Sequence, residues 1–110
     1  MPKYICFFSY TRDAAKAMIE KPTDRGAAAK ALVESLGGTM ECFYWMHGHH
    51  DGFFIADYKD GMSAAAVGAA AGSTGAITRV ETHELFDGPA QGQIMRAAKT
   101  ALAGYKPPTA

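Results

Sequence analysis

The sequence has few cysteines, few branched aliphatic residues and no excess of either charge. Two cysteines in 110 residues exclude a disulfide-based framework, and we expect a reducing, cytoplasmic location. Eleven basic residues balance eleven acidic ones, which argues against nucleic acid or an anionic membrane as a partner. No apolar run approaches the roughly 18 residues that a membrane-spanning helix needs, and we expect no signal peptide.

Alanine and aromatic residues supply most of the hydrophobic content. Leu, Ile and Val together number twelve, whereas there are 21 alanines and twelve aromatic residues. The stretches 11–42 and 59–85 contain no aromatic residue and hold most of the alanines. Because alanine favours helices and aromatic residues favour strands, composition alone divides the chain into helical and extended segments.

Hydrophobic periodicity and capping residues predict the individual elements. We expect strands at 3–10, 39–48, 52–58 and 76–86. We expect helices from about Thr11 to Glu20, over 23–36 with Pro22 near its first turn, from Asp60 to about Gly72, and from Asp87 to about Leu102. Asp51-Gly52 is typical of a tight primed turn between the second and third strands.

The order of these elements predicts an α+β fold. It matches the ferredoxin-like β-α-β-β-α-β arrangement, followed by an extra C-terminal helix. The sheet should be antiparallel, with strand order 4-1-3-2 and helices on one face. Residues 1–106 should form a single domain, and residues 107–110 a disordered tail.

The predicted hairpin defines two sheet faces, because paired residues share a face. We expect the helix-free face to carry Phe43, Trp45, His47, Phe54, Ala56 and Tyr58. We expect the face under the helices to carry Met40, Cys42, Tyr44, Met46, Phe53, Ile55 and Asp57. An uncovered aromatic face predicts a homodimer in which two helix-free faces meet and enclose a cavity. In the alternative, the C-terminal helix covers part of this face.

Polar residues of two other strands are expected to join the aromatic residues around this cavity. The predicted ligand pocket comprises Ser9, Trp45, His47, Phe54, Tyr58, Arg79, Glu81 and His83. Its aromatic rings would stack on a small aromatic or hydrophobic ligand, with hydroxyl groups such as that of Tyr10 as donors. In the alternative, the rings form an ordinary dimer core and the charged groups form salt bridges.

Two further chemistries are open. A histidine held by a carboxylate can act as a general base near neutral pH, and Glu81 could hold His83 in this way. The catalytic candidates are His47 or His83, acting with Tyr58 or Arg79. His47, His49 and His83 are metal-ligand candidates. The favoured interpretation is that His49 and His50 are exposed turn residues and that His47 makes a half-buried polar contact. We expect no cofactor, because the Gly-rich stretch 68–75 lacks the ending of a phosphate-binding loop.

Several segments resemble the GYD domain family: PKYICFFSYT, PTDRGAAAKALVESLGGTMECFYWMHG and HHDGFFIADY. The matching residues are Tyr4, Tyr10, Thr11, Leu36, Gly37, Gly38, Phe43, Tyr44, Trp45, Gly48, Asp51 and Gly52. The resemblance covers roughly the first 86 residues and includes the TRVET strand at 78–82. His50 stands where the family usually has tyrosine.

This resemblance implies the fold of the dimeric α/β-barrel superfamily, and therefore a homodimer. It implies no particular activity for the chain. Analogy to the superfamily supports, as an alternative to simple ligand binding, a cofactor-independent oxygenase or isomerase.

Overall fold

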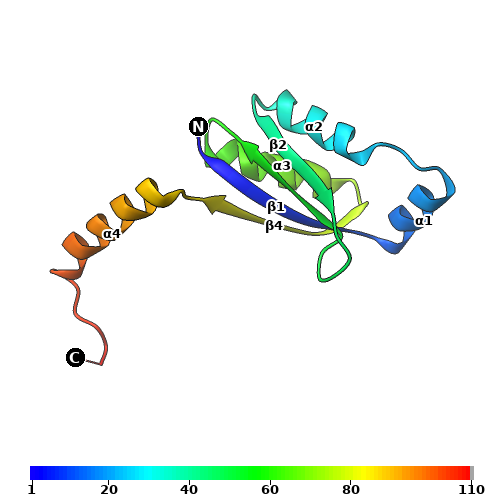
Figure 1. Ribbon diagram of the computed structural model, residues 1–110. Coiled ribbons are helices and arrows are strands. Elements are labelled where there is room, and N and C mark those ends of the chain that lie inside the picture. The colour runs from blue at the N-terminus through cyan, green and yellow to red at the C-terminus, as the bar shows by residue number, and fades with distance from the viewer. Residues whose placement is uncertain (110) are drawn as a thin grey trace.

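The computed structural model describes residues 1–109 and contains one four-stranded antiparallel sheet (Figure 1). Its strands are β1 (Lys3–Tyr10), β2 (Thr39–Trp45), β3 (Gly52–Asp57) and β4 (Ile77–Leu85). Its helices are α1 (Arg12–Glu20), α2 (Arg25–Ser35), α3 (Gly61–Ser73) and α4 (Gly88–Leu102). Ala110, the last residue of the predicted tail 107–110, lies outside the described residues.

The strand order confirms the predicted fold. The sheet runs β2-β3-β1-β4, which is the predicted order read from the opposite edge, and every neighbouring pair is antiparallel. With helices following β1 and β3, this is the α+β ferredoxin-like arrangement. The strand β1 lies between β3 and β4 and is therefore central to the domain.

Each helix begins after a side chain that accepts a hydrogen bond from the backbone of its first turn. The capping residues are Thr11, Asp24, Asp60 and Asp87. The second helix therefore starts later than predicted. Pro22 precedes its capping residue, because the Asp24 carboxylate accepts from the amide of Ala27 at 3.0 Å and fixes the start there.

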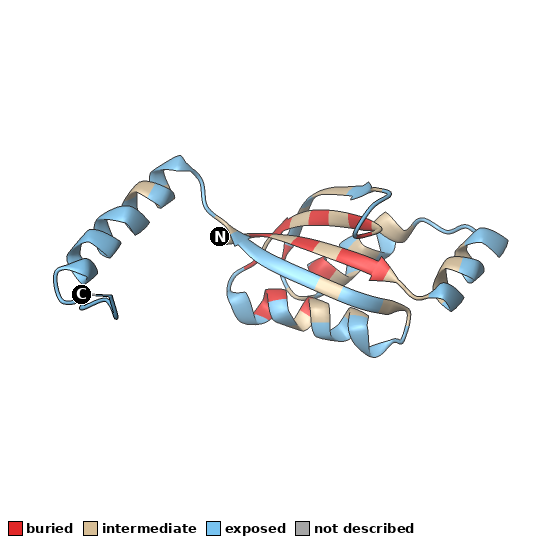
Figure 2. Cartoon of the chain, turned by 90° about the horizontal axis from the view of Figure 1, so that it is seen from below, coloured by how far each residue is buried: buried red, intermediate tan, exposed pale blue. Residues whose placement is uncertain are grey.

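The core lies between the sheet and the two helices α2 and α3. Its buried members are Tyr4, Cys6, Phe8, Val33, Phe54, Ala56, Tyr58, Ala64 and Val67. Figure 2 shows that buried residues concentrate in the sheet and in α3. Burial raises the pKa of the Cys6 thiol, so this cysteine is protonated at neutral pH.

The predicted assignment of the two sheet faces is wrong. Phe54, Ala56 and Tyr58 lie under the helices, whereas Phe53 and Ile55 lie on the helix-free face. The physical reason is volume. The helices present alanine and glycine to the sheet, and close packing then requires large rings from the sheet to fill the space between the layers.

A bulge in β2 further changes which residues share a face. Met40 pairs with Ala56 and Cys42 with Ile55, so Glu41 is the extra residue. Met40 consequently packs against the core, and Cys42 lies on the helix-free face. Alternation without this bulge placed both residues under the helices, which is right for Met40 and wrong for Cys42.

The helix-free face is apolar along its middle. Its apolar residues are Ile5, Phe7, Cys42, Tyr44, Phe53, Ile55 and Leu85. None of them is buried, and Tyr44 is 60% exposed. The ion pairs of Lys3 with Glu41 and Asp57 lie at one end of this surface, at 2.8 and 3.2 Å.

Helix α4 runs away from the sheet (Figures 1 and 2), so the alternative in which it covers the helix-free face of its own chain is wrong. None of its residues is buried. Ile94, Met95, Ala98 and Leu102 nevertheless form an apolar stripe at helical spacing, with Leu102 64% exposed. Because no residue of α4 is buried, the stripe has no packing partner among residues 1–109. A 15-residue helix in water gains most of its stability from packing, so a partner outside this part of the chain is expected.

Candidate functional site

The predicted pocket residues divide between the two faces of the sheet. Ser9, Arg79, Glu81 and His83 lie together on the helix-free side. Phe54 and Tyr58 belong to the core on the opposite side. Trp45 stacks on Tyr10 at the edge of that core, with ring centroids 5.7 Å apart. His47 is exposed in the loop that follows β2. The structure therefore does not bring the predicted set into one pocket.

The loop 46–51 has a different form from the predicted tight turn. The Met46 amide donates to the carbonyl of Asp51 at 2.8 Å, which closes the loop, and Gly52 already belongs to β3. Asp51 fastens the loop to the central strand. Its amide donates to the Phe8 carbonyl at 2.9 Å, and its carboxylate accepts from the Tyr10 amide at 2.8 Å.

This anchored loop folds His50 onto the helix-free face. The imidazole is only 5% exposed and stacks on the Phe7 ring, with centroids 5.3 Å apart. Its Nδ1 lies 3.4 Å from the Ser9 hydroxyl oxygen, and its Nε2 lies 3.9 Å from a carboxylate oxygen of Glu81. Ser9 is also buried, so a hydroxyl and an imidazole are held together in a largely dehydrated place beside a carboxylate.

Sequence reasoning missed His50, which was expected to be an exposed turn residue. A signal was present in the family pattern. The usual tyrosine at this position also carries a ring, and a ring can stack on Phe7 as His50 does. Because residue 50 is flanked by the anchoring Asp51, its place in the motif indicates a fixed side chain rather than a mobile turn.

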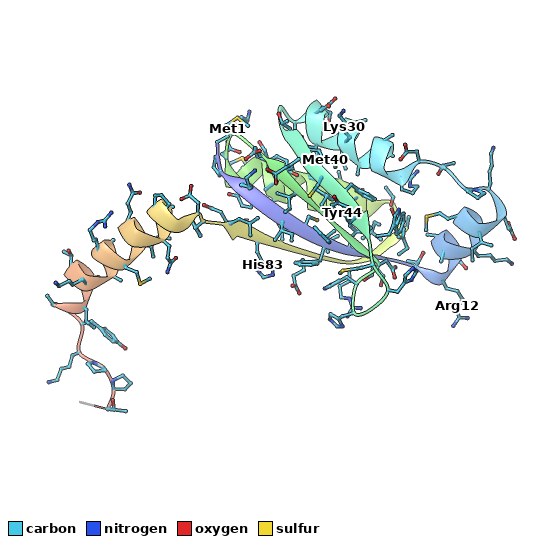
Figure 3. All side chains as sticks on the ribbon, viewed as in Figure 1. Met1, Arg12, Lys30, Met40, Tyr44 and His83 are labelled. Carbon is cyan, nitrogen blue, oxygen red and sulfur yellow. The ribbon has the colours of Figure 1, made fainter. Side chains whose placement is uncertain are left out.

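Glu81 connects this cluster to His83. Its second carboxylate oxygen lies 2.9 Å from Nε2 of His83, and this hydrogen bond holds the pKa of Glu81 below its ordinary value. Figure 3 shows His83 on the side of the sheet away from α2. Arg79 instead donates to the backbone carbonyl of His49 at 2.9 Å and so braces the loop. A hydroxyl, an imidazole and a carboxylate in this order can relay a proton, and an enzymatic role stays a prediction.

We expect replacement of His83 by alanine to raise the pKa of Glu81 towards its ordinary value of 4.5. Because the pKa of Glu81 is lowered in the folded chain, its ionised form stabilises the fold above that ordinary value, and the contribution is lost as the pH falls through the lowered pKa. Side-chain carboxyl chemical shifts followed against pH measure the change. His47→Ala is the control, and an equal shift in that variant would contradict the prediction.

Tyr58 is poorly placed for proton transfer. It is 2% exposed in the core, packs edge-on against Tyr4, and its burial raises its pKa to about 12. It also lies on the opposite face of the sheet from Arg79 and His83. The predicted combination of His83 with Tyr58 is therefore not assembled.

The metal-ligand candidates His47, His49 and His83 also stay apart. Among residues 1–109, no group of three or more histidine, cysteine or acidic side chains is placed to hold a metal ion. The His49 ring instead packs edge-on against His50, with centroids 4.7 Å apart.

Over residues 1–109, no helix combines the length and apolar character that crossing a bilayer requires.

A cavity of about 250 Å³ lies on the covered face, between α2, α3 and the sheet. Phe8, Phe43 and Phe54 form its aromatic floor, and Phe43 and Phe54 are nearly parallel, at 9°. The helices contribute mainly small or aliphatic residues: Ala28, Ala29, Leu32, Val67, Gly68, Ala70 and Ala71. Phe54 is thus a cavity residue as predicted, but the cavity is on the other side of the sheet.

A model of the GYD domain matches residues 4–98, which is most of the chain. The chain belongs to the GYD domain family. The match extends past β4 into α4, further than the resemblance noted in the sequence. Neither curated proteins nor solved structures gave a match.

In this GYD domain, the short motif around residue 50 has a structural explanation. Asp51 fastens the loop to β1, as described above. Gly52 is required by close approach, because a Cβ atom there would lie 2.6 Å from the Phe8 ring and 2.7 Å from the Tyr44 carbonyl oxygen. Gly48 has open space around it, so nothing in its surroundings requires glycine.

Proposed function

We propose that this GYD domain protein is a homodimer that binds a small aromatic or hydrophobic molecule. The observation that carries the proposal is the cavity of about 250 Å³ between the helices and the aromatic floor of the sheet. An engineered apolar cavity of about 150 Å³ is large enough to bind benzene. The present volume therefore suits a ligand with one or two rings.

The chemistry of the lining supports the same ligand class. Nearly parallel Phe43 and Phe54 rings offer faces on which a flat molecule can lie. The alanines and the glycine of α2 and α3 leave the space open, because they carry little or no side chain. An apolar ligand would replace contacts that this layer lacks, which favours binding by dispersion and by the hydrophobic effect.

Dimerisation is supported by the uncovered helix-free face. Phe7, Phe53 and Ile55 lie along the middle of the sheet, and none of the helices within residues 1–109 covers them. Contiguous apolar surfaces of this kind are typical of interfaces. A two-fold pairing of helix-free faces would cover the strip in both subunits and place the His50 cluster at or near the interface. The stripe of α4 also lacks a partner, which adds to the case for a second subunit.

Indole, a neutral two-ring molecule, tests ligand binding. We expect it to shift the NMR signals of Ala29, Val67 and their neighbours, and we expect Ala71→Leu to weaken binding by about tenfold because the added side chain fills the cavity. Ala31→Leu is the matched control, since Ala31 is exposed on α2 and does not line the cavity. Binding that Ala71→Leu leaves unchanged would overturn the site.

Light scattering at micromolar concentration tests the dimer. We expect a dimer mass for the native chain and a monomer for Ile55→Glu, because two-fold symmetry would bury two carboxylates in the apolar interface. Thr78→Glu, at an exposed position of β4, is the control and should remain dimeric. A monomer mass for the native chain contradicts this part of the proposal.

A further inference from the structure

A second cavity of about 400 Å³ lies beside the first, between α1, the 46–51 loop and the end of β2. Its walls include Met18, Ile19 and Trp45. Tyr10 and Arg25 line both cavities and are the two residues that they share. Arg25 is the first residue of α2, which begins after the connection from α1 (Figure 1).

Arg25 has no acidic partner where these cavities meet. Within residues 1–109, none of the ion pairs or side-chain hydrogen bonds of the structure involves its guanidinium group, although the residue is half-buried. Asp24, which precedes Arg25 in the chain, and Asp51, which lines the second cavity, make other hydrogen bonds. The carboxylate of Asp24 caps α2 through the Ala27 amide, and that of Asp51 accepts from the Tyr10 amide.

A cation beside an apolar cavity favours a ligand that has both an apolar body and a negatively charged group. A guanidinium group binds a carboxylate through paired, charge-assisted hydrogen bonds, whereas a wholly apolar ligand offers it no acceptor. The apolar body of such a ligand fits the first cavity, and of the described residues that line this cavity Arg25 alone is charged. The second cavity is a poorer place for the carboxylate than the position of Arg25 itself, because Asp51 contributes negative charge to its wall.

We propose that the ligand of this site is a small aromatic or hydrophobic carboxylate, with its ring on Phe43 and Phe54 and its carboxylate on Arg25. This inference rests on the proposed function, and it adds the charge of the ligand and the residue that recognises it. Tyr10 also lines both cavities, and its ring stacks on Trp45 with centroids 5.7 Å apart.

A matched pair of probes tests the inference: 3-phenylpropanoate and its neutral amide, 3-phenylpropanamide. Their bodies are the same, so titration calorimetry on the full chain isolates the effect of the charge. We expect the carboxylate to bind roughly tenfold more tightly than the amide. Arg25→Gln should remove this preference, because the carboxylate loses more affinity than the amide, whereas Arg25→Lys should retain part of it.

Arg12→Gln is the matched control, because Arg12 is exposed on α1 (Figure 3) and lines neither cavity. Equal binding of both probes to the native chain would overturn the role of Arg25 while the ligand site itself stands. A carboxylate preference that survives in Arg25→Gln would do the same. Failure of both probes, together with failure of indole, would instead overturn the proposed function.

Discussion

Replacement of Phe8 by alanine is expected to lower the free energy of unfolding by about 4 kcal/mol. Phe8 is 5% exposed on the central strand, and its ring lies within 6.3 Å, centroid to centroid, of four other rings. The truncation would remove a large buried apolar group and enlarge a cavity that already exists beneath the helices. Urea unfolding followed by Trp45 fluorescence measures the loss at fixed protein concentration.

Phe86→Ala provides the comparison for Phe8. Phe86 follows β4 and is 53% exposed, so its truncation creates no internal cavity. We expect Phe86→Ala to lower the free energy of unfolding by about 1 kcal/mol or less. Similar losses in the two variants would show that the core is not organised around the Phe8 ring.

Gly52→Ala is expected to lower the free energy of unfolding by about 3 kcal/mol, which is the second large effect. The new methyl group would meet the Phe8 ring at 2.6 Å and the Tyr44 carbonyl oxygen at 2.7 Å. The carbonyl belongs to the backbone of the paired strand, so the strain can be relieved only by moving β2 or displacing the Phe8 ring. The midpoint of urea unfolding should fall, with little change in its slope.

Gly48→Ala separates this steric effect from the general effect of losing a glycine. Gly48 lies in the adjoining loop, and no atom would lie within 4 Å of its added methyl group. We expect its unfolding free energy to stay within about 0.5 kcal/mol of the native value. A comparable loss at both positions would place the cause in backbone freedom rather than in contact with Phe8.

The elements of the fold were largely predictable because their signals are local. The first strand was predicted with its observed bounds, Lys3–Tyr10, because its apolar run is flanked by a polar capping residue. The covered face was not predictable by alternation. Side chains alternate between the two faces of a strand, and this alternation does not show which face the helices cover. Here the helices cover the more aromatic face, because their small side chains leave space that large side chains of the strands fill.

The candidate site was predictable only where it lies on regular strands. Ser9, Arg79, Glu81 and His83 were correctly placed near one another by strand order and parity. The position of His50 depends on bonds from Asp51 to Phe8 and Tyr10, which are about forty residues away in sequence. The shared role of Arg25 in two cavities depends on how α2 meets the sheet, which local pattern does not specify.

The two anchors of Asp51 have a consequence for local opening. Its amide and carboxylate bind the last residues of β1, so the loop cannot lift from the sheet without breaking hydrogen bonds at both places. The amides of Tyr10, Met46 and Asp51 should therefore exchange with deuterium at a common rate, as one cooperative unit. If they do, His50 is uncovered only in that rare open state, and the slow step of any encounter with its imidazole is the release of the loop.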